Sequence, residues 1–502
     1  MLIKIPRRAS KLCRSFALLT TSIISLFILF DFWQARNLIA APNSRSVHPP
    51  PVCPKSPLLD DVLVVIRTGA TEVLVKLPIH FRTVLTCVPD FVIYSDLEED
   101  VEGHHIIDVL DQINDKYRST APEFWLYNKL RATGRKSLNY QTSFGSGPAG
   151  ALDNPGWKLD KWKFLPMLNR SLQHRPNAKW FVFIEPDTYL IWQNVLEYLE
   201  RFDSSKPHYI GTGMYIGDVL FAHGGSGFII SNPAMKTVLD YWKEHQDWFD
   251  QYTAKEWAGD MVLGRAMKEA GISLSSASPH LQGNSLTGMD WTVNKLNKPT
   301  WCYAPLTFHH MTKPDFQIMW QFEEAWVRHK ERTATLRFRD VFKNIVQPQL
   351  QSERRKWDNT PTGTEYSDEA FAKLSEEDRK ALSETERKAQ VSFDYCRAVC
   401  ENKPSCIQFS YAPRKCIISN ELRVGHAVES QCLEYSHVAG NCIKTEDETQ
   451  DVAPNKELSV KSGWVMTRVL QSVEQMDQAY GPTYIQTNGR EAFAIEGDIV
   501  KY

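Results

Sequence analysis

Eight consecutive residues predict a buried strand that ends in a polar turn: Trp180-Phe181-Val182-Phe183-Ile184-Glu185-Pro186-Asp187. A short apolar run rich in aromatic and β-branched residues is typical of a strand covered on both faces. Glu185 and Asp187 follow this run at once, with one residue between them. Two carboxylates at a strand end can bind a divalent cation or a nucleotide, because Mg²⁺ and Mn²⁺ prefer hard oxygen ligands. An isolated acid-x-acid triplet is usually a solvated loop, so its place after this strand is what favours a binding site.

Two other segments repeat this design. Strands are expected over residues 61–66, which run into Arg67-Thr68-Gly69-Ala70, and over residues 91–96, which end at Asp96. Helices are expected between strands, such as residues 159–174 and 194–202. Strands that alternate with helices predict an α/β fold with a mostly parallel, doubly wound sheet. Ligands bind at the carboxyl ends of such strands, so the polar residues there are candidates for a site.

A glycine-rich loop precedes another apolar run in His223-Gly224-Gly225-Ser226-Gly227-Phe228-Ile229-Ile230-Ser231. Gly224, Gly225 and Gly227 let the backbone approach a ligand closely or take a positive φ. A plain tight turn explains the same loop equally well.

An acid and two histidines follow later in the chain. Asp260 lies in Trp257-Ala258-Gly259-Asp260-Met261, ahead of a helix expected over residues 265–270. This carboxylate is either functional or the N-cap of that helix. His309 and His310 follow Thr307-Phe308, and one of them can complete a cation site because neutral imidazole binds transition metals. Surface histidines are the alternative for that pair.

The overall composition sets limits. The chain has 502 residues, a length that predicts about three units at roughly 150 residues each. Hydrophobic residues make up 42% and charged residues 24%, which excludes global disorder. The 58 basic and 60 acidic residues nearly balance, and this argues against a nucleic-acid binder. Tryptophan rings can stack on the faces of sugars, although most of the 15 tryptophans are expected in the core.

The N-terminus predicts a membrane anchor. Residues 1–14 carry five basic residues and no acid, and residues 15–30 carry no charge. We expect a cytosolic tail (1–14), a signal anchor (15–33) extended by Phe32 and Trp33, and a Pro/Ser-rich stem (34–57). A signal peptide cleaved near Ala40 is the alternative. Either arrangement sends the rest of the chain into an oxidising lumen, and the first predicts a single-pass type II protein of the Golgi or endoplasmic reticulum.

The cysteines cluster near the C-terminus. Six of the ten lie between Cys396 and Cys442, after a main domain (58–345) and a segment dense in Glu, Lys and Arg (346–390) that predicts a partly helical linker. In a lumen, this spacing predicts a disulfide-rich α+β module over residues 391–470, with zinc as the alternative and residues 471–502 as a tail. We also expect Cys53 to pair with Cys87 and Cys432 with Cys442. These pairs do not include Cys302, which is either buried or used between chains.

Asn169 begins a glycosylation sequon that could be used only in the lumen.

The motifs, in this order, resemble those of the fringe and core 1 β1,3-galactosyltransferase group of inverting glycosyltransferases. They are most similar to the fungal branch, whose members add a C-terminal PAN/apple module. The resemblance covers residues 58–339 and the Cys-rich region. Besides the two strand motifs at Ile66–Gly69 and Phe91–Asp96, E-P-D-T-Y-L from Glu185 is similar to the family's D-D-D-T-Y-V, and G-G-S-G-F from Gly224 to G-G-A-G-F/Y. G-D-M-V-L-G from Gly259 is similar to E-D-V-x-L-G, and F-H at Phe308 to the final F-H.

The resemblance implies a GT-A fold that binds a UDP-sugar. Asp187 falls on the metal-binding Asp, Glu185 on the first acid of the triplet, Asp260 on the general base, and His309 on the metal-binding His, with His310 as the alternative. The nucleotide-sugar contacts would include Arg67, Thr68, Asp96, Glu185 and either Lys161 or Lys163. The PAN resemblance implies disulfides Cys396–Cys416 and Cys400–Cys406. The sequence departs from the family's pattern at Glu185, Pro186 and Gly259.

The implied function is transfer of a sugar from a UDP-sugar, with Mn²⁺ or Mg²⁺, to a hydroxyl of a glycan or glycoprotein acceptor in a β1,3 linkage. Two alternatives stay open. One is a catalytically degenerate binding protein that combines the GT-A domain with the PAN module. The other is a metal-dependent hydrolase of the lumen, for which no second acid or nucleophile pairing is evident. The expected partners are the UDP-sugar donor, the glycan or glycoprotein acceptor and the membrane, and no nucleic acid is expected. A disulfide through Cys302, or contacts of the PAN-like module, would allow an oligomer.

Overall fold

The computed structural model describes residues 50–138, 154–292, 300–329, 335–428, 432–436, 441–445 and 460–479. The chain divides into two units, Met1–Pro51 and Val52–Tyr502, and the described residues belong almost entirely to the second. The predicted cytosolic tail, the anchor over 15–33 and the stem up to residue 49 lie outside the described residues, as does the tail beyond residue 479. Within the described residues, no helix is long and apolar enough to cross a membrane.

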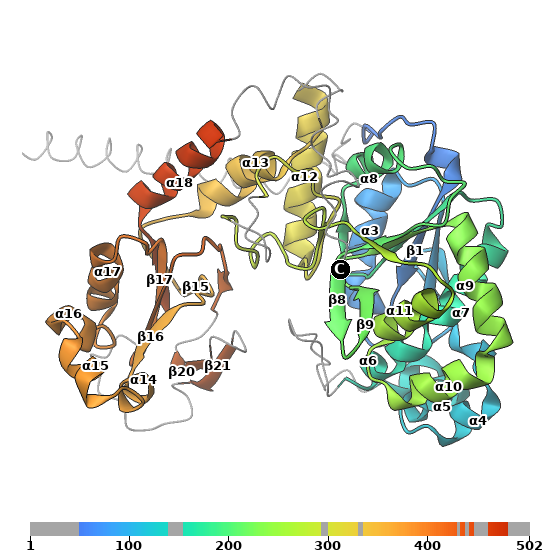
Figure 1. The fold of residues 1–502 in the computed structure, drawn as a ribbon, viewed down its shortest axis with the longest axis horizontal. Coiled ribbons are helices and arrows are strands. Elements are labelled where there is room, and N and C mark those ends of the chain that lie inside the picture. Colours follow the sequence, from blue (N-terminus) through green and yellow to red (C-terminus); the bar gives the residue numbers. More distant parts are fainter. Residues whose placement is uncertain are drawn as a thin grey trace, which may run out of the picture. The chain divides into compact units, whose positions relative to one another are not determined.

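An eight-stranded sheet forms the centre of the main domain (Figure 1). Its order is β11 (Leu274–Ser276), β7 (Tyr209–Gly211), β10 (Phe228–Ser231), β5 (Trp180–Ile184), β1 (Val62–Arg67), β2 (Phe91–Ser95), β4 (His104–Asp108) and β3 (Glu99–Val101). The predicted α/β class is therefore what the structure has, and the three predicted strands lie together as β5, β1 and β2.

The sheet is less parallel than the sequence predicts. The four strands β5, β1, β2 and β4 run parallel, and so do β11 and β7. In contrast, β10 pairs antiparallel with both β5 and β7, and β3 pairs antiparallel with β4. The direction of β10 follows from its connection, because the glycine loop at its start turns the chain back along β5.

Both faces of the sheet are covered by helices, as the apolar runs predict. In β1, Val62, Val64 and Ile66 belong to one core and Leu63 and Val65 to the other. The first core includes side chains of α3 (Pro78–Phe81), α8 (Trp192–Leu199) and α12 (Lys313–His329). The second includes those of α5 (Phe124–Thr133), α7 (Phe164–His174), α9 (Asn232–Glu244) and α11 (Gly259–Glu269). The continuous apolar runs of these strands are therefore explained by burial on both sides.

Helix boundaries differ from those predicted. The helix expected over residues 159–174 is divided into α6 (Pro155–Leu159), a 3₁₀ turn (Asp160–Trp162) and α7. The helix expected over residues 194–202 is α8, which starts two residues earlier and ends at Leu199. The helix expected from residue 265 already begins at Gly259, as α11. Asp260 therefore lies in its first turn.

Small sheets surround the carboxyl end of β5. A three-stranded sheet has the order β12 (Leu281–Gln282), β13 (Thr307–Phe308) and β6 (Tyr189–Leu190). A separate hairpin joins β8 (Gly213–Ile216) to β9 (Val219–Ala222). These short strands carry the chain back to the edge where β5 ends.

The C-terminal region has its own antiparallel sheet. Its order is β14 (Arg354–Arg355), β22 (Lys461–Trp464), β17 (Gln408–Ala412), β18 (Lys415–Ser419) and β16 (Thr364–Ser367). Helix α17 (Phe393–Asn402) is joined by disulfides Cys396–Cys416 and Cys400–Cys406, the pairs that the PAN resemblance implies. A third disulfide joins Cys53 to Cys87. Cys302 is buried and belongs to none of these three, and the predicted Cys432–Cys442 pair involves side chains outside the described set.

The segment 346–390 is not the linker that its charge predicts. It contributes β14, β16 and the short strand β15 (Trp357–Asp358), followed by helices α14 (Asp368–Ala372), α15 (Glu376–Ala381) and α16 (Glu384–Arg387). Tyr366 and Ala389 are buried in one core with Cys396 and Phe409. These few apolar residues fix the segment to the module, while its many charged side chains remain on the surface.

The C-terminal sheet shares its core with the main domain. Leu422, Val424 and Trp464 lie in the same apolar cluster as Trp291. The Trp291 N–H donates to the Leu422 carbonyl at 3.0 Å, and the Leu422 N–H donates to Asp290 Oδ1 at 3.1 Å. The two regions are therefore continuous in packing.

Candidate active site

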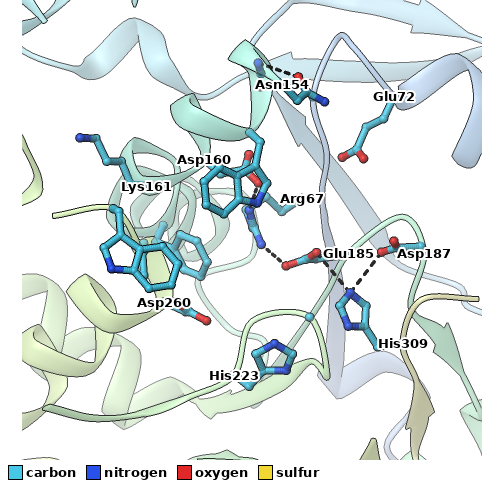
Figure 2. Close-up of a pocket in the computed structure, with 18 of the residues that line it drawn as sticks. Arg67, Glu72, Asn154, Asp160, Lys161, Glu185, Asp187, His223, Asp260 and His309 are labelled. Atoms are coloured by element: carbon cyan, nitrogen blue, oxygen red, sulfur yellow. Dashed lines mark hydrogen bonds and ion pairs between the residues drawn. The ribbon is translucent and has the colours of Figure 1, made fainter. Parts of the chain in front are cut away.

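The two acids of the triplet lie at the carboxyl end of β5, where the strand pattern predicts them (Figure 2). Two residues beyond Asp187, β6 pairs with β13 so that Tyr189 faces Phe308. This pairing brings the next residue, His309, back to the acids. His309 Nε2 lies 3.4 Å from Asp187 Oδ1 and 3.6 Å from Glu185 Oε2.

These residues fit a divalent cation. One ligand atom each from Asp187, His309 and His310 lies within 4.8 Å of the others. Oδ1 of Asp187 is buried and accepts no hydrogen bond from the described residues. Both histidines of the pair lie at this cluster, since His310 Nδ1 is 3.9 Å from Asp187 Oδ2. A carboxylate with imidazoles suits Mn²⁺ or a similar metal, because its oxygen and nitrogen donors are both acceptable ligands.

Two basic side chains already contact the acids. Lys76 Nζ lies 3.0 Å from Asp187 Oδ2 and 2.9 Å from Glu72 Oε2. The Arg67 guanidinium donates to Glu185 Oε1 and, at 2.5 Å, to Asp160 Oδ2. Arg67 also lies over the Phe164 ring, 4.3 Å from its centroid. Each acid of the triplet thus has a protein cation on one oxygen and His309 near the other.

The electrostatics follow from these contacts. Burial alone would raise the pKa of Glu185, but the Arg67 and His309 side chains outweigh it and lower that pKa. Burial also opposes ionisation of Asp187, yet His309 and Lys76 hold its pKa far below the usual range. Both acids are therefore ionised at neutral pH. Burial raises the pKa of Glu72 to about 7, although Lys76 acts in the opposite direction.

The glycine loop fits closely between the acids. A Cβ on Gly225 would lie 2.1 Å from Cε1 of His309, so no larger residue fits beside that ring. Gly227 has φ +80°, a conformation that glycine adopts without strain. A Cβ on Gly224 would lie between Glu185 Oε1 and Asp260 Oδ2, at 3.3 Å and 3.4 Å. The loop is thus a spacer between the two acids of the triplet and Asp260, and more than a tight turn.

Asp260 is held at the start of α11 with its carboxylate fixed. Oδ2 accepts the Gly224 N–H at 2.9 Å, and Oδ1 accepts the Met261 N–H at 2.9 Å. The N-cap is Ala258, so Asp260 lies inside the helix and does not cap it. Burial raises the pKa of Asp260 to about 6, although the Gly224 N–H and Arg67 favour the ionised form. This pKa suits a general base near neutral pH.

These groups share one cavity of about 320 Å³. Arg67, Glu185, Asp187, Asp260 and His309 all line it. The wall also includes residues that the sequence did not single out as candidates: Glu72, Lys76, Asn154, Trp157, Asp160, Phe164, Met214, Ile216, His223 and Trp257. A carboxylate suited to accept a proton from a hydroxyl, a set of residues that fit a cation and room for a substrate thus occur together.

Four of the predicted nucleotide-binding residues do not offer a polar group to the cavity. Lys163 is fully buried and donates to the Thr68 carbonyl at 2.7 Å and to Asp160 at 2.8 Å. Asp96 accepts the Ala70 N–H at 2.7 Å, and neither it nor Thr68 lines the cavity. Lys161 lines the wall, but its ammonium binds Glu123 at 2.8 Å and two carbonyls. These residues support the turn after β1 and the helix beside it, whereas Arg67 and Lys76 present charge to the site.

The departures from the family's pattern have local reasons. A Cβ on Gly259 would lie 2.4 Å from the Phe164 ring and 2.7 Å from the Lys161 Cα. The space that the family's acid would need is therefore filled by Phe164, on which Arg67 stacks. The Pro186 carbonyl lies 2.9 Å from His80 Nε2, which fixes the turn between the two remaining acids.

The predicted glycosylation site is inside the fold. Asn169 lies in α7, is buried, and its amide lies 3.4 Å from Gln112 Oε1. Ser171 of the same sequon is fully buried. A glycan on Asn169 does not fit the folded domain, since the sequon faces a neighbouring element and not solvent.

Sequence reasoning missed Lys76, Asp160, His223 and the two tryptophans of the cavity. Glu72 and Lys76 are four residues apart just after β1, a spacing that places both on one side of a helix. Asp160 lies directly before Lys161, the first of the two lysines that were favoured for nucleotide contact. For Trp157, no signal in the sequence separates it from the other tryptophans.

Residues 160–315 match the family model described as Fringe-like. Fringe-like domains are glycosyltransferases, so the chain carries a glycosyltransferase domain. The match includes both acids of the triplet, the glycine loop, Asp260 and both histidines. It does not include Arg67, Lys76 or Trp157, which reach the same cavity from the preceding part of the chain.

Proposed function

We propose that this protein is an inverting glycosyltransferase that moves a sugar from a UDP-sugar to a hydroxyl of a glycan or glycoprotein, forming a β1,3 linkage. The observation that carries the proposal is the position of Asp260. Its fixed carboxylate lines the same cavity as Asp187 and His309, but the Gly224 backbone separates it from them. One base that stands apart from a cation site is the minimum that a single displacement requires.

Asp187, His309 and His310, with Glu185 beside them, are the residues that would hold Mn²⁺ or Mg²⁺. When bound, the cation supplies positive charge that stabilises the diphosphate leaving group. Arg67 and Lys76 add protein charge at the same end of the cavity, and both can donate hydrogen bonds to phosphate oxygens. They replace the lysines that the sequence favoured for this role.

Asp260 accepts the proton of the acceptor hydroxyl as its oxygen attacks the anomeric carbon. The C–O bond to the diphosphate breaks on the opposite side of that carbon, and UDP leaves with the bonding electron pair. One displacement inverts the configuration, so an α-linked donor gives a β-linked product. The Gly224 and Met261 N–H groups hold the carboxylate in place throughout.

The setting of the enzyme is part of the proposal. The basic and apolar N-terminus, the stem and the three disulfides support a type II protein of the Golgi or endoplasmic reticulum. The C-terminal module has a helix that one disulfide joins to β18 and another joins to Cys406, just before β17. This arrangement supports a PAN/apple-like binding unit for acceptor or partner. A fungal relative of the core 1 β1,3-galactosyltransferases has this combination of parts.

The test is Asp260→Asn in the full chain. This change keeps the shape of the side chain but removes its basicity, so transfer should fall by about 10²-fold or more. Binding of UDP with Mn²⁺ should stay within about threefold, because Asp260 does not lie among the cation-binding residues. Transfer at nearly the wild-type rate would contradict the proposal. Asp218→Asn, on an exposed turn whose side chain is 69% accessible, is the matched control.

A further inference from the structure

The cavity has two ends of different chemistry. Around the cation site, its wall is formed by charged groups, including Arg67, Glu72, Lys76, Glu185 and Asp187. Around Asp260, it is formed mostly by apolar side chains: Trp157, Phe164, Met214, Ile216, Phe221 and Trp257. The diphosphate of a donor belongs at the charged end, so the apolar end is left for the second substrate.

Two indole rings dominate the apolar end. Trp157 and Trp257 lie with their ring centroids 6.2 Å apart and their planes inclined by 27°. Trp257 is 60% exposed, which is high for a side chain of this size. On the same side, the hairpin of β8 and β9 exposes Met214 by 40% and Tyr215 by 54%. Exposed aromatic surface that borders a cavity is typical of a ligand contact.

The position of the base restricts what can bind there. Trp257 is three residues before Asp260, at the entrance to α11. Both side chains line the cavity, so a molecule that gives a hydroxyl proton to Asp260 lies in the same cavity as this indole. Trp257 is therefore a candidate surface for the acceptor.

The charge at this end restricts the ligand further. Among the described residues that line this part of the wall, the one ammonium is that of Lys161, which is bound to Glu123 and to the carbonyls of Ala254 and Glu256. The other ionisable side chains here are the Asp260 carboxylate and the His223 imidazole, and the nearby Arg67 guanidinium is paired with Asp160 and Glu185. An anionic acceptor would meet the negative charge of Asp260, while the cations of Lys161 and Arg67 are already paired with acids, so the site favours an uncharged acceptor.

The gap between the rings decides where that ligand lies. A ring inserted between two others needs about 7–8 Å, since each contact takes about 3.5–4.0 Å. The observed 6.2 Å is too narrow, so the ligand contacts the open face of Trp257 while Trp157 supports its other face. A pyranose suits this surface, because its C–H bonds form an apolar face that is attracted to the negative face of an indole.

We propose that the open face of Trp257, supported by Trp157, binds an uncharged pyranose residue of the acceptor and directs one of its hydroxyls to Asp260. This inference rests on the proposed function for the identity of Asp260 as the base. It adds the chemical class of the acceptor and the surface that selects it.

The experiment measures binding of saccharides to the full chain by saturation-transfer NMR. The probes are methyl glycosides of galactose, N-acetylgalactosamine, glucose and mannose, with methyl glucuronide as the anionic comparison. At least one neutral glycoside should bind, and Trp257→Ala should weaken it by about tenfold or more, with a smaller loss for Trp157→Ala. Trp257→Phe should retain most of the affinity. Trp125→Ala, which removes a side chain that is 55% exposed and does not line the cavity, is the matched control.

Three results would overturn the inference: unchanged affinity in Trp257→Ala, tighter binding of the glucuronide, or no binding of any neutral glycoside to the wild type. Binding of UDP with Mn²⁺ is measured in the same samples by calorimetry. Saccharide binding that depends on Trp257, without any UDP binding, would refute the proposed function and leave the saccharide site standing. UDP binding without a saccharide site that depends on Trp257 would refute this inference and leave the proposed function standing.

Discussion

The two ends of the cavity are built in opposite ways. At the cation end, Asp187 is 8% exposed and contacts Lys76, His309 and His310, so each of its oxygens has a neighbour. At the other end, Trp257 is 60% exposed, and among the described residues Trp157 alone stacks on it. The first end is fixed before any ligand arrives, whereas the second leaves surface open. Such a difference suits a constant donor group, the diphosphate, and a more variable acceptor.

The largest expected effect is at the fixed end. Asp187→Ala removes the carboxylate on which His309, His310 and Lys76 converge. Mn²⁺-dependent binding of UDP should fall by more than about 100-fold, because a direct ligand contributes more than the outer contacts that tune it. Calorimetry with and without Mn²⁺ measures this. Wild-type affinity in the variant would show that the cation binds elsewhere.

The pH dependence of kcat/KM tests the other end of the cavity, where Asp260 is the proposed base. Burial raises the pKa of Asp260 to about 6, and only the ionised carboxylate can accept the proton. The value of kcat/KM should therefore be level above pH 7 and fall about tenfold for each unit below about 6. Glu185 and Asp187 at the cation end have lowered pKa values and stay ionised over this range. A profile that is flat down to pH 5 would be incompatible with Asp260 as the base.

The smallest effect expected is also the most specific. Lys76 Nζ lies 3.0 Å from an oxygen of Asp187 and competes with any cation for that carboxylate. Lys76→Met should tighten binding of Mn²⁺ in the absence of nucleotide by up to about tenfold, since one positive charge is removed beside the site. Titration of Mn²⁺ followed by electron paramagnetic resonance measures free ion directly. Weaker or unchanged binding would show that Lys76 supports the site and does not compete for it.

The control for that prediction is Lys179→Met. Lys179 pairs with Asp61 at 2.8 Å at the opposite end of β5, and its side chain is 52% exposed. The Lys179→Met substitution also removes one positive charge beside the central sheet, but it does not change the cavity. Its Mn²⁺ affinity should equal that of the wild type.

The sequence predicted the strand ends well because burial on both faces leaves a continuous apolar run. Glu185 and Asp187 are next to such a run, and His309 follows a short strand that pairs beside them. The ammonium groups of Lys161 and Lys163 could not be placed from the sequence, because their spacing along the chain does not show which way the turn between α6 and α7 points. Their ammonium groups are used inside the fold, while Lys76, from a short helix, faces the site.

The C-terminal region shows the same limit in another form. The dense charge of residues 346–390 predicts a solvated linker, but the few apolar residues among them, such as Tyr366 and Ala389, are enough to fix strands and turns to the module. Periodicity cannot reveal this, because strands of two to four residues are too short to show a repeat.

The burial of Asn169 could not be predicted either, since a sequon carries no information about burial.

The central claim is that this cavity uses a UDP-sugar, and one measurement tests it most directly. The full chain is incubated with each common UDP-sugar and Mn²⁺, without acceptor, and the release of UDP is followed. The account predicts slow, Mn²⁺-dependent release of UDP from at least one of these donors, and none after chelation. No release from any UDP-sugar, together with no Mn²⁺-dependent UDP binding, would contradict it.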